Sequence, residues 1–192
     1  MSFYRTFMVD PLGALKGNLA NGIQSQLALL FSPVISNFYE GNWVYFTADQ
    51  ASPMNNELLV YFMPSGQSIV QMLPGLSQTA DFTSDGWTAW VGSLVASEVY
   101  VSQSDPVLLA KLAFHELMHN RFLQGNSMHS QQDGLGATSI GPSTPLTPTN
   151  IRTMAAVIQN PSQQWGAGFL FSAVEKLILS HRTTNRKPKR IP

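Results

Sequence analysis

The sequence contains no cysteine, so a disulfide framework and a cysteine-ligated zinc site are both excluded. Charged residues make up only 11% of the 192 residues, against roughly 25% in an average soluble domain. The 11 basic and 11 acidic side chains cancel, so the formal net charge is zero. Because nucleic-acid binding depends on an excess of basic side chains, we do not expect the body of the chain to bind nucleic acid. Any metal site must use histidine, aspartate or glutamate.

Long apolar runs are also missing, and we therefore predict no membrane span. The segment 27–35 is apolar, but it is short and contains Pro33. Residues 1–13 include an aspartate and a proline where a signal peptide needs an apolar core, so we expect no Sec-type export. The sequence favours a cytoplasmic location, or export by another route such as an injection system.

Hydrophobic residues nevertheless make up 44% of the chain, which is enough to build a core, and the length suits one domain. We predict a single domain over residues 1–181, with an N-terminal lobe over 1–104 and a C-terminal lobe over 105–181. Five of the 11 basic residues fall in the last eleven positions, so residues 182–192 form a basic tail. Such a tail is typical of a solvated chain end or of a segment that docks into a larger assembly.

The pattern of apolar residues predicts a mixture of helices and strands. Runs rich in β-branched and aromatic residues predict strands at 42–47, 58–63, 87–91 and 96–102, while 68–73 fits a strand or a short helix. Helical spacing predicts helices at 15–31, 107–122, 149–159 and 165–182. Residues 125–150 are rich in Gly, Ser, Thr and Pro, and a loop of that length is usually functional.

The helix at 107–122 has the clearest boundaries in the chain. Asp105 is a polar N-cap, and Pro106 occupies the first helical position. No glycine or proline interrupts the segment up to Phe122, and Gly125 is well placed to end it. We therefore expect a well-formed helix.

His115, Glu116 and His119 lie on this helix in the sequence His-Glu-Leu-Met-His. A spacing of four puts both imidazoles on one helix face, one turn apart, where they can share a metal ion. Glu116 borders the same face and can take a proton from a water that the metal has made more acidic. These residue types at this spacing predict a hydrolytic zinc site.

At this motif the chain resembles the zincin metallopeptidases, over roughly residues 96–136. The resemblance implies an α+β fold, in which a small twisted sheet and a helix precede an active-site helix that forms the cleft floor. A loop-rich C-terminal lobe would close the cleft, and residues 126–148 would shape the substrate pocket. In zincins a strand near this helix often pairs with the substrate backbone, and 96–102 precedes the helix closely.

A catalytic zinc needs a third protein ligand, for which the sequence offers three candidates. His129 is our predicted ligand, and with Gly125 it resembles the metzincin arrangement, although both residues come later than in the strict metzincin spacing. Asp133 would resemble the aspartate-ligated zincins. Glu175, on the predicted C-terminal helix, would resemble the thermolysin-like group.

The sequence alone leaves several further roles around the metal open. Met154 is either a methionine beneath the metal, as in metzincins, or an ordinary core residue. The candidates for stabilising an oxyanion are Arg152, Asn120 and His181. The acids that could orient the ligating imidazoles are Asp105, Asp133, Glu98 and Glu175.

The sequence thus predicts a zinc metallopeptidase that binds Zn²⁺ through His115, His119 and His129, uses Glu116 as general base, and acts on a protein or peptide substrate. The alternative is a non-enzymatic structural or cargo component of a phage-like or contractile injection assembly that retains a zincin fold. Low charge and the basic tail motivate this alternative, and an injected toxin peptidase would combine both functions.

Overall fold

The structure is a computed structural model of the whole chain. It describes residues 4–35, 42–47, 58–72, 82–91, 94–121, 128–130 and 133–159. The strands are β1 (Tyr4–Val9), β2 (Asn42–Thr47), β3 (Leu58–Pro64), β4 (Gly86–Val91) and β5 (Leu94–Val101). The longer helices are α1 (Leu19–Ile35), α2 (Pro106–Met118) and α4 (Pro148–Gln159), and short 3₁₀ turns are η1 (Val70–Met72), η2 (His119–Arg121) and η3 (Gly134–Gly136).

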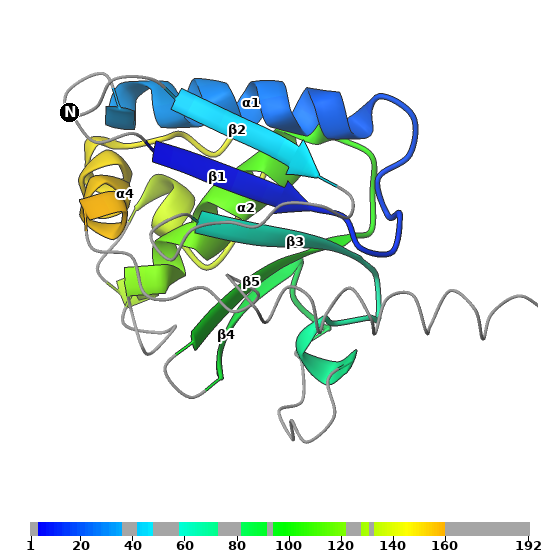
Figure 1. Cartoon of the computed structure of the whole chain (residues 1–192). Coiled ribbons are helices and arrows are strands. Elements are labelled where there is room, and N and C mark those ends of the chain that lie inside the picture. Colours follow the sequence, from blue (N-terminus) through cyan, green and yellow to red (C-terminus); the bar gives the residue numbers. More distant parts are fainter. Residues whose placement is uncertain are drawn as a thin grey trace, which may run out of the picture.

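The five strands form one sheet in the order β2-β1-β3-β5-β4. Neighbouring strands run parallel from β2 through to β5, and only β4 is antiparallel to its neighbour, β5. The central strand β3 is an almost continuous apolar run, as expected for a strand that is covered on both faces. β4 therefore occupies one end of the sheet, next to β5 (Figure 1).

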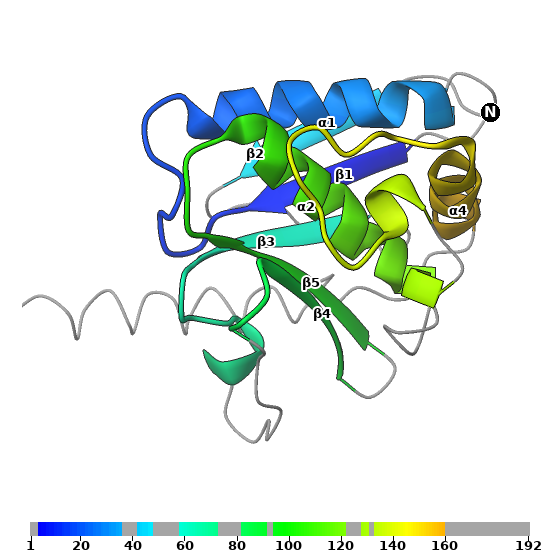
Figure 2. The same ribbon diagram turned by 180° about the vertical axis from the view of Figure 1, so that it is seen from behind.

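Alternate side chains of β3 belong to two separate hydrophobic cores. Val60 and Phe62 join a cluster that includes residues of α1, α2 and α4, so these helices share one face of the sheet (Figures 1 and 2). Leu59 and Tyr61 join a second cluster on the opposite face, which includes Val70 of η1. The chain is thus built from a helical layer packed on one face of a sheet.

Most of the predicted elements that fall on described residues are confirmed. β2, β3, β4, β5 and α4 match the predicted strands and helix to within two residues at either end, and 68–73 contains a short 3₁₀ helix rather than a strand. The helix predicted at 15–31 is found at Leu19–Ile35, where Ile23, Leu27 and Phe31 are fully buried along one face. The predictions at 165–182 and 182–192 lie outside the described residues.

The strand β1 was not predicted. Arg5 and Thr6 interrupt its apolar pattern, although Met8 contributes to one core and Phe7 to the other. The broader prediction of a mixed α and β chain with a small sheet is confirmed. Among the helices that the structure describes, none is both long and apolar enough to cross a bilayer.

Candidate metal centre

The helix α2 carries the first two residues of the site. It begins as predicted: Asp105 is the N-cap, its side chain accepts a hydrogen bond from the amide of Val107 at 2.9 Å, and Pro106 follows. The α-helix ends at Met118, and His119 begins the 3₁₀ turn η2 instead of lying inside a longer helix. The predicted helix end near residue 122 is therefore late, and Gly125 lies outside the described residues.

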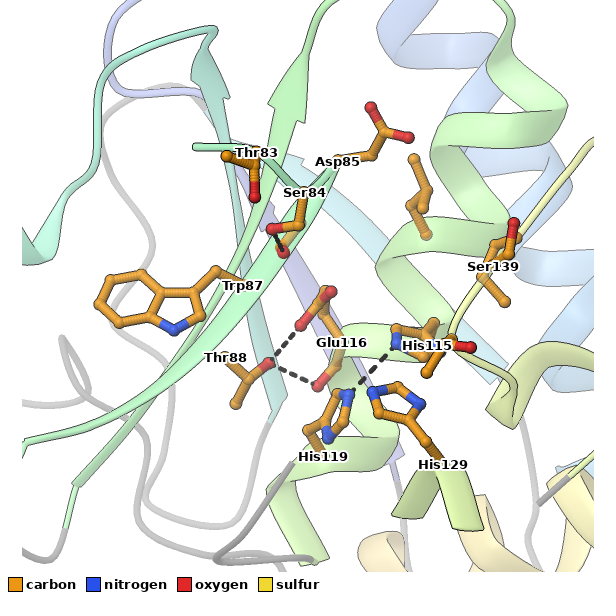
Figure 3. A pocket seen from close by; sticks show the side chains of 14 residues that line it. Thr83, Ser84, Asp85, Trp87, Thr88, His115, Glu116, His119, His129 and Ser139 are labelled. Atoms are coloured by element: carbon orange, nitrogen blue, oxygen red, sulfur yellow. Dashed lines mark hydrogen bonds between the residues drawn. The ribbon is translucent and has the colours of Figure 1, made fainter. Parts of the chain in front are cut away.

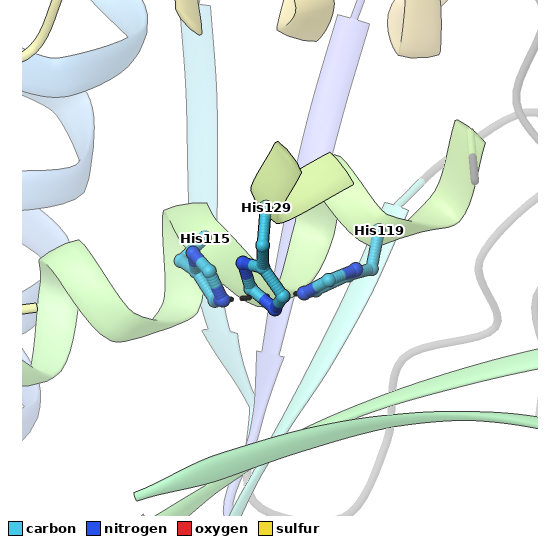
Figure 4. A group of neighbouring side chains, drawn as sticks. All are labelled: His115, His119 and His129. Atoms are coloured by element: carbon cyan, nitrogen blue, oxygen red, sulfur yellow. Dashed lines mark hydrogen bonds between the residues drawn. The ribbon is translucent and has the colours of Figure 1, made fainter. Parts of the chain in front are cut away.

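Three imidazoles converge beside this helix end. His115 comes from α2, His119 from η2, and His129 from the short helical segment 128–130 (Figure 4). Their ring centroids are 4.8, 5.0 and 5.2 Å apart, and one candidate ligand atom from each lies within 4.8 Å of the other two. The structure thus brings together the three residues that the sequence predicts as metal ligands.

The backbone of η3 fixes which ring nitrogen faces the cluster. Nδ1 of His115 lies 2.6 Å from the carbonyl oxygen of Leu135, and Nδ1 of His129 lies 3.1 Å from that of Gly136. Because a carbonyl oxygen only accepts, both Nδ1 atoms donate. In the neutral rings the Nε2 atoms are then unprotonated, so each has a lone pair available for a metal.

These backbone acceptors correct the prediction that acids orient the imidazoles of His115 and His129. Asp105 caps α2, and Asp133 accepts a hydrogen bond from Thr147 at 2.7 Å. Glu98 accepts a hydrogen bond from the hydroxyl of Ser68 on the opposite face of the sheet. Glu175 lies outside the described residues. The sequence signal for the actual partners was only the proximity of two glycines in 134–136, which favours a tight turn.

The spacing of the His115 and His119 nitrogens suits a zinc ion. Nε2 of His115 and Nε2 of His119 lie 3.2 Å apart. Two imidazole nitrogens on a tetrahedral zinc, each at about 2.0–2.1 Å, are separated by about 3.3 Å. Three nitrogen donors also favour zinc over oxygen-preferring cations such as Mg²⁺ or Ca²⁺. The residues therefore fit the metal that the sequence predicts.

Burial keeps two of these imidazoles neutral. Removal from water lowers the pKa of His115 from 6.5 to about 4, with a smaller contribution from the charge on His129, while the bond to Leu135 opposes the shift. Burial, followed by the charges on His115 and His129, lowers the pKa of His119 to about 3. Neutral imidazoles near pH 7 are the form that binds metal.

Glu116 is buried between α2 and β4. Its Oε2 accepts a hydrogen bond from the hydroxyl of Thr88 at 2.8 Å, and its backbone carbonyl lies 3.2 Å from the hydroxyl of Ser97. Burial raises the pKa of Glu116 to about 8; the Thr88 bond opposes the shift, and the charge on Glu98 adds to it. The carboxyl is thus held in one place, and a zinc ion beside it would favour the ionised form that a general base needs.

The three histidines and Glu116 line one pocket of about 510 Å³. The other walls are residues 83–88, which include the start of β4, residues 138–140 of the loop, and Leu112. Figure 3 shows Thr88, the Glu116 side chain and the three imidazoles around the same space. The described part of the 126–148 loop therefore contributes residues to this pocket.

Of the alternative third ligands and oxyanion candidates, those on described residues lie outside the histidine group and the pocket. Asp133 is exposed and outside the histidine group. Arg152 is exposed and 3.4 Å from Thr149, and neither Arg152 nor Asn120 lines the pocket. Met154 is a core residue of α4. His181 lies outside the described residues, so the group that would stabilise an oxyanion is not assigned.

No protein-family model matches the sequence, and no match is found among curated proteins.

Proposed function

We propose that the chain is a zinc-dependent peptidase of the zincin type, in which His115, His119 and His129 hold the metal and Glu116 is the general base. The observation that carries the proposal is the convergence of three imidazoles, two of them oriented by backbone carbonyls, beside a buried carboxylate in one pocket. A purely structural metal site would have no need of that carboxylate.

The chemistry divides between the metal and the chain. A zinc ion held by the three histidines would acidify a water molecule and polarise a carbonyl group. Glu116 accepts the proton of the attacking water and returns it to the leaving amine. Thr88 keeps the carboxylate against β4, so the base does not have to be ordered before each turnover.

The position of β4 supports a peptide as the substrate. The sequence pointed to the strand at 96–102, but β5 lies between β3 and β4 and both of its edges are paired. Within the described sheet, β2 and β4 are the two edge strands, and it is the first residues of β4 that line the pocket. An extended peptide could add to that edge through main-chain hydrogen bonds, beside the histidines.

The layer arrangement is also in keeping with the zincin resemblance. A small sheet and α1 precede α2, and α2 carries the motif along the pocket floor. The loop that contains η3 then supplies another wall. The alternative role as an assembly component rests on the tail 182–192, outside the described residues; co-purification with a large particle would support it.

The test is cleavage of a mixed peptide library by the zinc-loaded chain, read by mass spectrometry, with Glu116→Gln as the matched variant. The glutamine keeps the shape of the side chain but cannot accept the proton. We expect wild-type cleavage and a loss of at least about 100-fold in the variant, with zinc content unchanged. Equal cleavage by both proteins would refute the mechanism.

A further inference from the structure

The orientations of two of the three imidazoles depend on a single turn of the backbone. The consecutive carbonyl groups of Leu135 and Gly136, in η3, accept the Nδ1 protons of His115 and His129. A rotation of either peptide plane would therefore redirect an imidazole. Whatever fixes η3 also fixes the direction in which these two Nε2 atoms point.

The side chain of Asn150, at the start of α4, holds this turn. Its Oδ1 accepts hydrogen bonds from the amide of Leu135 at 2.9 Å and from that of Thr147 at 3.1 Å. Its Nδ2 donates to the carbonyl oxygen of Asp133 at 2.8 Å. The residue is fully buried, so water cannot replace these bonds if the amide is removed.

The backbone at Gly134 is closely packed against its neighbours, which restricts movement of the turn. Its φ of +51° is in the left-handed region, and a Cβ there would lie 2.4 Å from the carbonyl oxygen of Pro145 and 2.8 Å from Oδ1 of Asn150. The backbone of η3 thus packs directly against the segment that leads into α4. Asn150 supplies the polar contacts across this close approach.

We propose that Asn150 is a positioning residue for the metal centre, which acts through the Leu135 and Gly136 carbonyls on His115 and His129. This inference rests on the proposed metal site. Asn150 contacts neither the metal ligands nor the pocket, and the proposal is that it nevertheless affects metal affinity through these carbonyls. It also couples the start of α4 to the geometry of the site.

The decisive comparison is between Asn150→Ala and Asn150→Asp in the full chain. Alanine removes all three bonds and leaves the Leu135 amide buried without an acceptor. Aspartate keeps an oxygen for the Leu135 and Thr147 amides, but its second oxygen can donate to the Asp133 carbonyl only when the acid is protonated. Val9→Ala is the control, because it removes buried volume from the core on the opposite face of the sheet.

Zinc affinity is measured by competition with a chromophoric chelator, and ligand geometry by the visible absorption of the cobalt-substituted proteins. We expect Asn150→Ala to bind zinc roughly tenfold more weakly with an altered cobalt spectrum, and Asn150→Asp to stay within about threefold of wild type. Val9→Ala should keep both the affinity and the spectrum. If Asn150→Ala does not fold, Asn150→Ser takes its place with the same expected loss.

The inference is overturned if Asn150→Ala binds zinc as tightly as wild type with the same spectrum, or if Val9→Ala weakens binding equally. Both results leave the proposed function intact, since wild type still binds zinc. A wild-type chain that binds no zinc would instead refute the proposed function, and the inference with it.

Discussion

Gly86 of β4 and Glu116 of α2 are in direct contact in the wall of the pocket. A Cβ placed on Gly86 would lie 2.6 Å from Oε1 of Glu116 and 2.9 Å from its Cγ. Real Cβ atoms do not approach other atoms this closely, so the space next to the strand is available only because residue 86 has no side chain. The edge strand therefore determines where the proposed base lies.

We predict that Gly86→Ala displaces the Glu116 carboxylate and lowers kcat by roughly 10-fold or more, because a small misplacement of a catalytic group is costly. Zinc content should be unchanged, since the three atoms nearest to the added methyl group all belong to Glu116. The measurement is steady-state peptide hydrolysis with zinc analysis. Gly141→Ala is the matched control, because its Cβ would meet only Oγ1 of Thr144, at 3.8 Å. Unchanged kcat in Gly86→Ala would contradict the assigned position of the base.

Zinc should stabilise the folded chain measurably. A ligand at about 100 times its Kd adds about 2.7 kcal/mol to the free energy of unfolding, which corresponds to roughly 5–10 °C in Tm for a domain of this size. His129→Ala should abolish most of this shift, whereas Asp133→Ala should keep it, because Asp133 bonds to Thr147 and lies outside the histidine group. A shift that depends on Asp133 instead would reverse the assignment of the third ligand.

Glu98 gives the fold a pH dependence that is separate from the metal site. Burial raises its pKa from 4.5 to about 7, although hydrogen bonds from Ser68 and the Val70 amide oppose the shift. The folded chain therefore binds this proton more tightly than the unfolded chain. The resulting stability is fully present below about pH 4.5 and is lost as the pH rises through about 7.

We predict that Glu98→Gln, which stays neutral, gains stability relative to wild type by an amount on the order of 3 kcal/mol between those two pH values. Urea denaturation of both proteins at several pH values measures the difference. A difference that is constant with pH would show that Glu98 titrates alike in the folded and unfolded chain.

Local patterns were enough to predict part of the site. Asp105 and Pro106 marked the start of α2, and the spacing of His115 and His119 put both imidazoles on one face. His129 was predicted from the resemblance to the metzincin arrangement, despite its later position, and the structure brings it to the other two histidines. Each of these inferences depends on residues that are close in sequence.

The parts that were not predicted depend on tertiary contacts. The carbonyl acceptors for the histidines carry no side-chain signature, and Asn150 reaches them only because α4 packs against η3. Similarly, Gly86 contacts Glu116 only because β4 lies at the edge of the sheet facing α2. Strand order follows from long-range pairing, which periodicity along the chain does not encode.

The most direct test of the account is anomalous diffraction at the zinc absorption edge from crystals of the zinc-loaded chain. We predict one strong peak bounded by the Nε2 atoms of His115, His119 and His129, at about 2.0–2.1 Å from each. Nδ1 of His115 should remain on the Leu135 carbonyl. The account would be contradicted by the absence of zinc at this position, or by a zinc ion that His129 does not ligate.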